Sequence, residues 1–435
     1  MALCIVCILL VPFAGAGLWF VNTGLGRSRS AAHSMMSSLC VIAVAAFVYV
    51  VCGFAWQGVI GRPAHVFTVG GKAWNWIAAE PLFFRGLKLD GSPASLAAWL
   101  QMLSVGLAAL IPLGAGADRW RLRACCLSTA LLAGLTYPLF AHWVWGGGWL
   151  AQLGVNYGLG HGFVDAGGAS SIQAVGGLTA LAISWILGPR RGKYSLEGMP
   201  AAIPGHNAVL VLFACLLALL GWSGLNCAGA MLFTGAEPGR TVLIAVNTTL
   251  AAASSALMAA VITGIRFGKP DASLSANGWI GGLVASSAAC AFITPAAAIV
   301  IGLVAGTLVI LAVEWFELRM AVDDPGGAIS VHAVGGIWGV LAVGFFAHFP
   351  SRVLNAVSGP SSWSSDSNQW VAQLVGVATL LGFVLPLTYC LNWLLNRFYP
   401  QRVPAEGERQ GMDLYELGAG AYPEFATYTE DFTQR

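Results

Sequence analysis

Charged residues are scarce in this chain, and their scarcity excludes a water-soluble globular protein. Asp, Glu, Lys and Arg make up 9% of the 435 residues, whereas a soluble domain carries roughly 25%. With a hydrophobic fraction of 57% and a mean hydropathy of +0.75, the chain cannot cover its surface with polar groups, so lipid must cover it. The net charge of +2 gives no sign of a nucleic-acid partner. Composition therefore predicts an all-α membrane protein that crosses the bilayer many times.

Sequence motifs of common enzymes are missing as well. The chain contains no HExxH, no GxSxG and no pair of carboxylates inside an apolar segment, so we expect it not to be an enzyme. Most of the ten cysteines lie within apolar runs, where we interpret them as small core residues; examples are Cys4, Cys7, Cys40, Cys52 and Cys215. We expect no metal site and no cofactor.

Eleven apolar segments approach the length of about 20 residues that a membrane span needs. The first begins close to the N-terminus. It lacks a basic leader region and a clear cleavage site, so we interpret it as a span and not as a signal peptide. The eighth segment is the shortest. The predicted spans lie near residues 3–24, 38–60, 96–116, 124–144, 169–188, 207–226, 241–265, 277–293, 295–318, 328–347 and 371–395.

Lys and Arg in the loops predict the orientation of these spans. Every odd-numbered loop and the polar tail are basic, as Arg27 and Arg29 show for the first loop, whereas the fourth loop, 145–168, has no basic residue. The second loop is an exception, but it is long and also acidic. Because positively charged loops stay in the cytoplasm, we predict an N-terminus outside the cell membrane and a C-terminus inside, which requires an odd number of spans. Residues 1–395 then form the transmembrane domain and 396–435 a cytoplasmic tail.

An internal repeat divides the transmembrane domain. Residues 165–178 read DAGGASSIQAVGGL and residues 324–337 read DPGGAISVHAVGGI, so an Asp, two Gly pairs, an Ala, a Ser and an Ala-Val pair recur at a constant offset of 159. The first copy opens the fifth span from outside and the second opens the tenth from inside. The halves therefore have opposite topology, the inverted-repeat plan of many transporters and channels. We predict five-helix repeats over 1–190 and 205–347, followed by an extra helix at 371–395.

One polar residue stands at the same place in each copy of the repeat. Gln173 and His332 each follow the Asp of their copy by eight residues, which is about 12 Å along a helix. Inverted symmetry makes the two residues face each other near the middle of the membrane, where polar side chains are costly and usually functional. The alternative for His332 is an ordinary hydrogen bond between packed helices.

Several segments of the chain, taken together, resemble the ammonium transporter (Amt/Rh) family, and the resemblance covers residues from about 10 to 425. They are GADRWRLR at 116–123, AHWVWGGG at 141–148, the Asp165 segment with GPRRGKY at 188–194, LGWSGLNCAG at 220–229, NGWIGGLVASSAACAFITP at 277–295, VDDPGGAISVHAVGGIWG at 322–339 and RQGMDLYELGAGAY at 409–422.

The resemblance implies a homotrimer with one narrow pore through each subunit. In the family, a Trp and a Ser bind ammonium outside, two Phe rings gate the pore, and two His side chains inside it share a hydrogen bond. A cation–π site suits the recruitment step because a bare cation is costly in a dry pore. The tail segment of the family contacts neighbouring subunits and a PII-type regulator. By position, Trp145 corresponds to the recruiting Trp, Asp165 to a structural Asp of the outer site, and His332 to the second pore His.

The remaining pathway positions depart from the family pattern, so the chain resembles a divergent member. Gln173 stands at the first pore His, Ser104 and Leu225 stand at the two gate Phe positions, and Gly229 replaces the Ser of the outer site. The loop between Trp145 and Asp165 is also about eight residues longer than the usual pattern. Gln can still hydrogen-bond His332, but only His can carry a proton in the physiological pH range.

Four functions therefore stay open at this point. The first is a channel or transporter for ammonium or ammonia with altered selectivity. The second is an ammonium sensor with weak or no conduction that signals through its tail, which the altered pore and the retained tail motif favour. An intramembrane enzyme and a purely structural membrane protein are the others. Measurement of ammonium uptake discriminates the first two.

Overall fold

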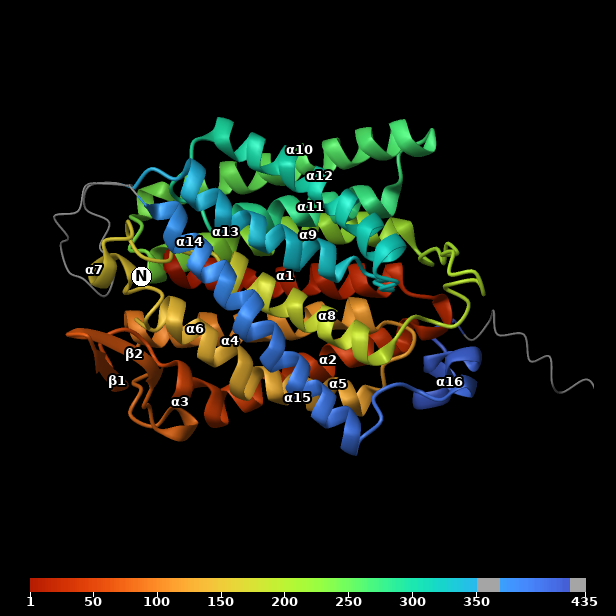
Figure 1. Ribbon diagram of the computed structural model, residues 1–435, viewed down its shortest axis with the longest axis horizontal. Coiled ribbons are helices and arrows are strands. Elements are labelled where there is room, and N and C mark those ends of the chain that lie inside the picture. Colours follow the sequence, from red (N-terminus) through yellow and green to blue (C-terminus); the bar gives the residue numbers. More distant parts are fainter. Residues whose placement is uncertain (350–367, 423–435) are drawn as a thin grey trace, which may run out of the picture.

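The computed structural model describes residues 1–349 and 368–422, and in these ranges it confirms a polytopic helical membrane protein. Ten helices there are long and apolar enough to cross a membrane, and they form one elongated bundle (Figure 1). The predicted eighth span corresponds to α11 (Ala272–Ser286), which has only 15 residues and passes into turns before Ile293. The difference from eleven spans arises because this helix ends early.

The spanning segments agree with the predicted ones to within a few residues, except at the start of the second and at the end of the sixth, which was predicted at 226 and lies at Phe233. They are α1 (Ala2–Leu25); Ser28–Gln57 with α2 (Ala31–Val48), η2 (Tyr49–Gly53) and α3 (Phe54–Gln57); α4 (Pro93–Gly116); Leu122–Trp145 with α5 (Leu122–Leu131), η4 (Leu132–Thr136) and α6 (Tyr137–Trp145); η5 (Ala169–Ala174) with α8 (Val175–Leu187); α9 (Ala208–Phe233); Pro238–Phe267 with α10 (Thr241–Phe267); α12 (Pro295–Arg319); η7 (Ile329–Val334) with α13 (Gly335–Phe346); and α14 (Gln369–Thr379), η8 (Leu380–Val384) and α15 (Leu385–Phe398).

Two of the spans form the centre of the bundle. The most apolar windows of α4 and of the η5–α8 segment are 83% and 89% buried, whereas that of the α14–α15 segment is 28% buried. The first two have the lowest exposure because protein surrounds them, while the last lies mostly at the surface of the bundle. The centre of the bundle therefore contains one of the two repeat copies.

The two repeat copies pack against each other reciprocally. A Cβ added at Gly177 on α8 would overlap the backbone at Ala333, and one added at Gly336 on α13 would overlap the backbone at Ala169 and Ala174. Residues 177 and 336, and likewise 174 and 333, are equivalent under the offset of 159. A reciprocal contact of this kind is what a pseudo-two-fold axis between inverted copies produces. Small residues allow the two backbones to approach this closely.

A β-hairpin stands at one end of the bundle, within the long second loop. Strand β1 (Ala64–Val69) pairs antiparallel with β2 (Lys72–Ala78), and Gly70 and Gly71 form the turn with positive φ values of 58° and 75°. Figure 1 shows the hairpin and the short helix α7 (Leu153–Tyr157) at the same end, which we call the hairpin end. The sequence predicts only a long loop for this segment, so the hairpin is an addition that the structure makes.

The opposite end, which we call the tail end, carries the C-terminal segment. Helix α16 (Ala405–Gln410) and the turn η9 (Asp413–Leu417) lie there (Figure 1). Asp413 accepts hydrogen bonds from the backbone N–H groups of Ala32 and His33 at the start of α2. Glu416 accepts one from the N–H of Leu122 at the start of α5. Both carboxylates cap helix N-termini, and through them the tail segment is docked on the membrane domain.

Candidate functional site

Each repeat copy begins with an aspartate that caps a π-helical turn. The Asp165 carboxylate accepts hydrogen bonds from the N–H groups of Gly168, Ala169, Ser170 and Ser171 at 2.8–3.1 Å, and from the Ser170 hydroxyl. In the second copy, Asp324 accepts hydrogen bonds from Ala328 and Ile329, the equivalents of residues 169 and 170. Single π-helical turns are frequent at functional sites. Asp165 is therefore a structural residue that fixes the start of the turn containing Gln173.

The structure joins the two polar residues of the repeat. His332 Nδ1 lies 2.7 Å from Gln173 Oε1, so the prediction of a hydrogen bond across the repeat interface is confirmed. Both side chains are buried, at 5% and 0% exposure. An amide oxygen only accepts, so the imidazole Nδ1 carries the proton and Nε2 is the free lone pair in the neutral ring. Among the described residues, Gln173 Nε2 has no hydrogen-bond partner, as expected of a donor reserved for a transient solute or water.

Trp145 lies at the hairpin end, in contact with the loop that leads to Asp165. Its Nε1 donates a hydrogen bond to the carbonyl oxygen of Asp165 at 2.7 Å. Its ring stacks on Phe233 with a centroid distance of 4.3 Å and an interplanar angle of 12°, and the side chain is 3% exposed. One face of the indole is therefore taken by Phe233. Phe233 was missed in the sequence, although it follows Leu225 and Gly229 at helical spacing on α9.

The helix α9 approaches the Asp165 loop so closely that position 229 has no room for a side chain. A Cβ at Gly229 would lie well inside 3.0 Å of the carbonyl oxygen of Ala166, and 3.3 Å from the Cα of Gly167. The absence of the family's Ser at this position thus has a steric reason. Trp145, Asp165 and Gly229 consequently form one cluster around the loop.

The two positions that resemble gate residues are buried within the bundle. Ser104 on α4 is 0% exposed, and its hydroxyl donates to the carbonyl oxygen of Leu100 on its own helix at 2.8 Å. Leu225 on α9 is 1% exposed. Helix α4 packs against both η5 and α9. Ser104 therefore lies on a helix that contacts the Gln173 turn, and Leu225 lies on a neighbour of that helix, but neither one reproduces an aromatic gate.

Two glutamines on α14 hold the loop that leads to Asp165 in place. Gln369 accepts from the N–H of His161 at 2.8 Å and donates to the carbonyl of Gly162 at 2.7 Å. One turn further, Gln373 accepts from the N–H of Val164 at 2.9 Å and donates to its carbonyl at 2.8 Å. The extra helix outside the repeat therefore positions the segment that ends at Asp165. Neither residue is among the predicted site residues; the available signal is a polar Gln373 inside a predicted span.

A charged network closes the tail end of the bundle. Arg190 contacts Asp323 at 2.9 Å and Asp118 at 3.0 Å, and Arg119 lies 3.7 Å from Asp323, all with side chains at most 3% exposed. Burial alone would raise the pKa of Asp323, but the neighbouring Arg119 and Arg190 outweigh burial and hold this pKa below its ordinary value. The network therefore stays ionised and ties the third loop to the segments before and after the repeat copies.

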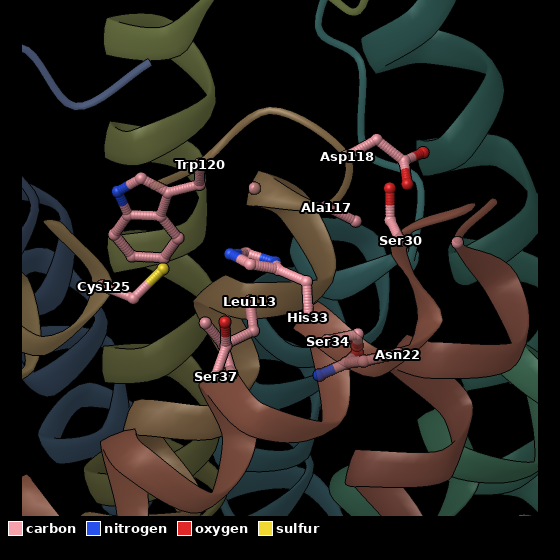
Figure 2. A pocket seen from close by; sticks show the side chains of 12 residues that line it. Asn22, Ser30, His33, Ser34, Ser37, Leu113, Ala117, Asp118, Trp120 and Cys125 are labelled. Carbon is pink, nitrogen blue, oxygen red and sulfur yellow. The ribbon is translucent and has the colours of Figure 1, made fainter. Parts of the chain in front are cut away.

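A cavity lies beside this network, away from the Gln173–His332 pair. Twelve residues line it, mainly from α1, α2 and α4, and Figure 2 shows the imidazole of His33 projecting across its middle. Trp120 and Cys125 lie on one side of the ring, and Asp118 and Ser30 on the other (Figure 2). None of the predicted pathway residues lines this cavity. Among the described residues, no group of three or more His, Cys, Asp or Glu side chains could hold a metal ion.

Comparison with known proteins gives one consistent family. A model of the Ammonium Transporter Family matches residues 2–422. The ammonium transporter Amt2 of Archaeoglobus fulgidus is 36% identical over 98% of this chain and 89% of its own length. The ammonium transporter of Bacillus subtilis is 30% identical over 96% of each chain.

Solved structures share the fold. A structure titled "Sensor Amt Protein" superimposes with a TM-score of 0.83 at 28% identity, covering 95% of this chain and 97% of that one. Candida albicans Mep2 superimposes with a TM-score of 0.74 at 23% identity, over 96% and 90% of the two chains. The Mep2 likeness bears on the fold alone.

Proposed function

The chain belongs to the ammonium transporter family, and from this premise we propose that it transports ammonium or ammonia across a membrane through one pathway per subunit. The observation that carries the proposal is the His332–Gln173 hydrogen bond, formed between two π-helical turns at the reciprocal repeat interface. Transport sites of inverted-repeat proteins lie at this interface, near the middle of the membrane. Trp145, Asp165, Gly229, Ser104 and Leu225 would border the pathway between the hairpin end and this pair.

The hydrogen bond assigns different tasks to the two partners. Gln173 Oε1 holds the proton on Nδ1 of His332, so the lone pair of Nε2 is available to the transported species. An ammonium ion that reaches Nε2 gives it one proton and continues as neutral ammonia, and the imidazolium passes that proton on to water. Gln173 cannot take part in the proton transfer, because its amide does not titrate. The relay therefore depends on His332 alone.

Recruitment of the cation would occur at the hairpin end. The cation would bind on the face of the Trp145 indole opposite to the one stacked on Phe233, and an aromatic face attracts a cation by roughly 0.5–2 kcal/mol. Asp165 fixes the ring through its carbonyl oxygen, which accepts the indole N–H. Trp145→Leu should therefore weaken ammonium affinity without unfolding the bundle.

The remaining expectations concern assembly and orientation. We place the protein in the cell membrane as a homotrimer, with the N-terminus outside and the tail in the cytoplasm. The transmembrane domain would span 1–395, with repeats at 1–190 and 205–347 and the extra helix at 371–395. The tail, 396–435, would offer its docked segment to a PII-type regulator. We propose no enzymatic activity.

The test is charge transport in proteoliposomes after an ammonium jump, measured by solid-supported-membrane electrophysiology. His332→Ala should abolish the ammonium-dependent current or change its pH dependence, and Gln173→His should increase proton-coupled current by supplying a second imidazole. His348→Ala is the matched control, because this histidine is exposed at the hairpin end. Unchanged current and pH dependence in His332→Ala would show that the Gln173–His332 pair serves only helix packing. Absence of any transport by the parent protein, with ammonium-dependent tail docking retained, would favour the sensor.

A further inference from the structure

The cavity at the tail end is lined by groups that accept hydrogen bonds. The Asn22 amide nitrogen donates to the carbonyl of Leu110 at 3.0 Å, so its amide oxygen is the group left for the cavity. The Asp118 carboxylate accepts one bond on each oxygen, from the Arg27 backbone N–H and from Arg190. A carboxylate has about four acceptor positions, so capacity remains on Asp118.

The imidazole of His33 presents a further acceptor. Its Nε2 lies 3.0 Å from Glu416. Burial alone would raise the pKa of Glu416, but its hydrogen bonds to His33 and to the Leu122 N–H outweigh burial and hold the pKa below its ordinary value. The carboxylate is therefore ionised at neutral pH and can only accept, so Nε2 of His33 donates. In the neutral ring this leaves the lone pair of Nδ1 as an acceptor.

A buried hydroxyl without a partner completes the set. Ser37 is 2% exposed, lines the cavity, and its Oγ has no hydrogen-bond partner among the described residues. A buried polar atom of this kind calls for a ligand or a water. The neighbouring Ser38 differs, because its hydroxyl donates to the Ser34 carbonyl at 2.9 Å and the residue does not line the cavity.

The chemistry of the lining selects among small solutes. No Lys or Arg lines the cavity, whereas a carboxylate, an amide oxygen, an imidazole lone pair and hydroxyls do. A ligand that only donates hydrogen bonds, carries one positive charge and is about the size of water satisfies this set best. Ammonium has these properties: four N–H donors in tetrahedral directions and no acceptor. A water molecule would use two of its four positions as an acceptor, and the side-chain donors that the lining offers to it are the hydroxyls of Ser30, Ser34 and Ser37.

We propose that this cavity is an ammonium-binding site on the tail side of the membrane, separate from the transport pathway, and that its occupation strengthens docking of the tail. The identity of the ligand rests on the proposed function. The coupling follows from two contacts: His33 contacts Glu416 through its ring, and its backbone N–H donates to Asp413 at 2.7 Å. An ammonium ion on the other ring nitrogen adds positive charge next to these two tail carboxylates and so favours the docked tail.

The experiment measures protease protection of the tail in the purified full-length protein. Ammonium chloride replaces choline chloride at constant ionic strength, and trypsin cleavage after Arg409, whose side chain is 70% exposed, is followed by mass spectrometry. Ammonium should slow cleavage with a saturable midpoint. Ser37→Ala should raise that midpoint about tenfold, because a hydrogen bond to a charged ligand is lost. Ser38→Ala, the matched control, should leave it unchanged.

The other outcomes separate the cavity from the pathway. His332→Ala should leave the tail midpoint as in the parent, and loss of the effect in this variant would place the ligand in the pathway and overturn the proposal. Cleavage that ignores ammonium, a shift of equal size in Ser38→Ala, or protection by potassium at the same midpoint would each overturn it too. If the parent transports no ammonium while the Ser37-dependent protection persists, the proposed transport fails and the cavity site stands.

Discussion

Replacement of Gly229 by the serine that the family resemblance calls for should damage this protein. The site has no space: a Cβ there would overlap the carbonyl of Ala166 and lie 3.3 Å from the Cα of Gly167. Overpacking of this kind typically costs about 1–3 kcal/mol. The obstacle here is backbone, which cannot rotate away as a side chain can.

The obstructing segment is also held from behind, and this raises the expected cost. Ala166 N–H donates to the carbonyl of Ala288 at 3.1 Å, and Gly167 N–H donates to that of Ser287 at 2.9 Å. A retreat of the segment that makes room for a side chain sacrifices both bonds, at about 1 kcal/mol each. We therefore expect Gly229→Ser to lower the free energy of unfolding by about 3–5 kcal/mol in total.

The assay is thermal unfolding of the purified protein in detergent, followed by tryptophan fluorescence, together with ammonium half-saturation in proteoliposomes. Gly382→Ser is the matched control, because Gly382 also lies in a spanning segment but a Cβ there meets no atom within 4 Å. Gly229→Ser should melt several degrees lower than the parent and should not gain ammonium affinity, while Gly382→Ser should resemble the parent. A Gly229→Ser protein of parental stability with tighter ammonium binding would refute the steric argument.

Three further predictions concern the residues that position the site and the tail. Gln373→Leu leaves the N–H and carbonyl of Val164 unpaired, which costs about 1–3 kcal/mol of stability, and it should raise the ammonium half-saturation concentration. Thr379→Val on the same helix should not raise it, and an equal rise in both variants would contradict the positioning role. Asp165→Asn replaces an acceptor by an amide donor facing backbone N–H groups and should lower unfolding free energy by about 2–3 kcal/mol, seen as a lower melting temperature. Because the pKa of Glu416 lies below its ordinary value when the tail is docked, its contribution to docking is complete at neutral pH and is lost as the pH falls through the lowered pKa. Pepsin, which is active in this acid range, should therefore release the tail faster as the pH falls, and Glu416→Gln should flatten this dependence.

The spans, the repeat and the central hydrogen bond could be predicted because they depend on patterns of single residues. Apolar segments of about 20 residues reveal where lipid must lie, and the offset of 159 between two copies places Gln173 opposite His332 whatever the details of packing. The second span was predicted to begin at 38, ten residues later than it does, because the polar stretch after Ser28 lowers the mean hydropathy at that end. Hydropathy alone does not locate the start of this helix, because its polar first turn is stabilised by Asp413 of the distant tail.

Features that depend on contacts between distant segments could not be predicted. The clamp by Gln369 and Gln373 joins residues more than 200 positions apart, and the stacking of Phe233 on Trp145 is visible only once α9 and α6 are placed. The hairpin is a different case, because Gly70-Gly71 between alternating residues is a recognisable turn signal and was overlooked within a long loop. The π-helical turns leave no periodic signature in the sequence.

Close packing of the backbone at the repeat interface explains which positions keep the family pattern and which depart from it. Gly177 and Gly336 cannot change, because any side chain at either position would overlap the opposing repeat copy, and so the scaffold of the interface is preserved in both halves. Gln173 and His332 lie on the same turns, but their side chains hydrogen-bond each other, so a change between these two residue types does not bring a side chain against the opposing backbone. An inverted repeat can therefore keep a symmetric frame while its central pair becomes asymmetric, with one partner that fixes the tautomer and one that moves the proton.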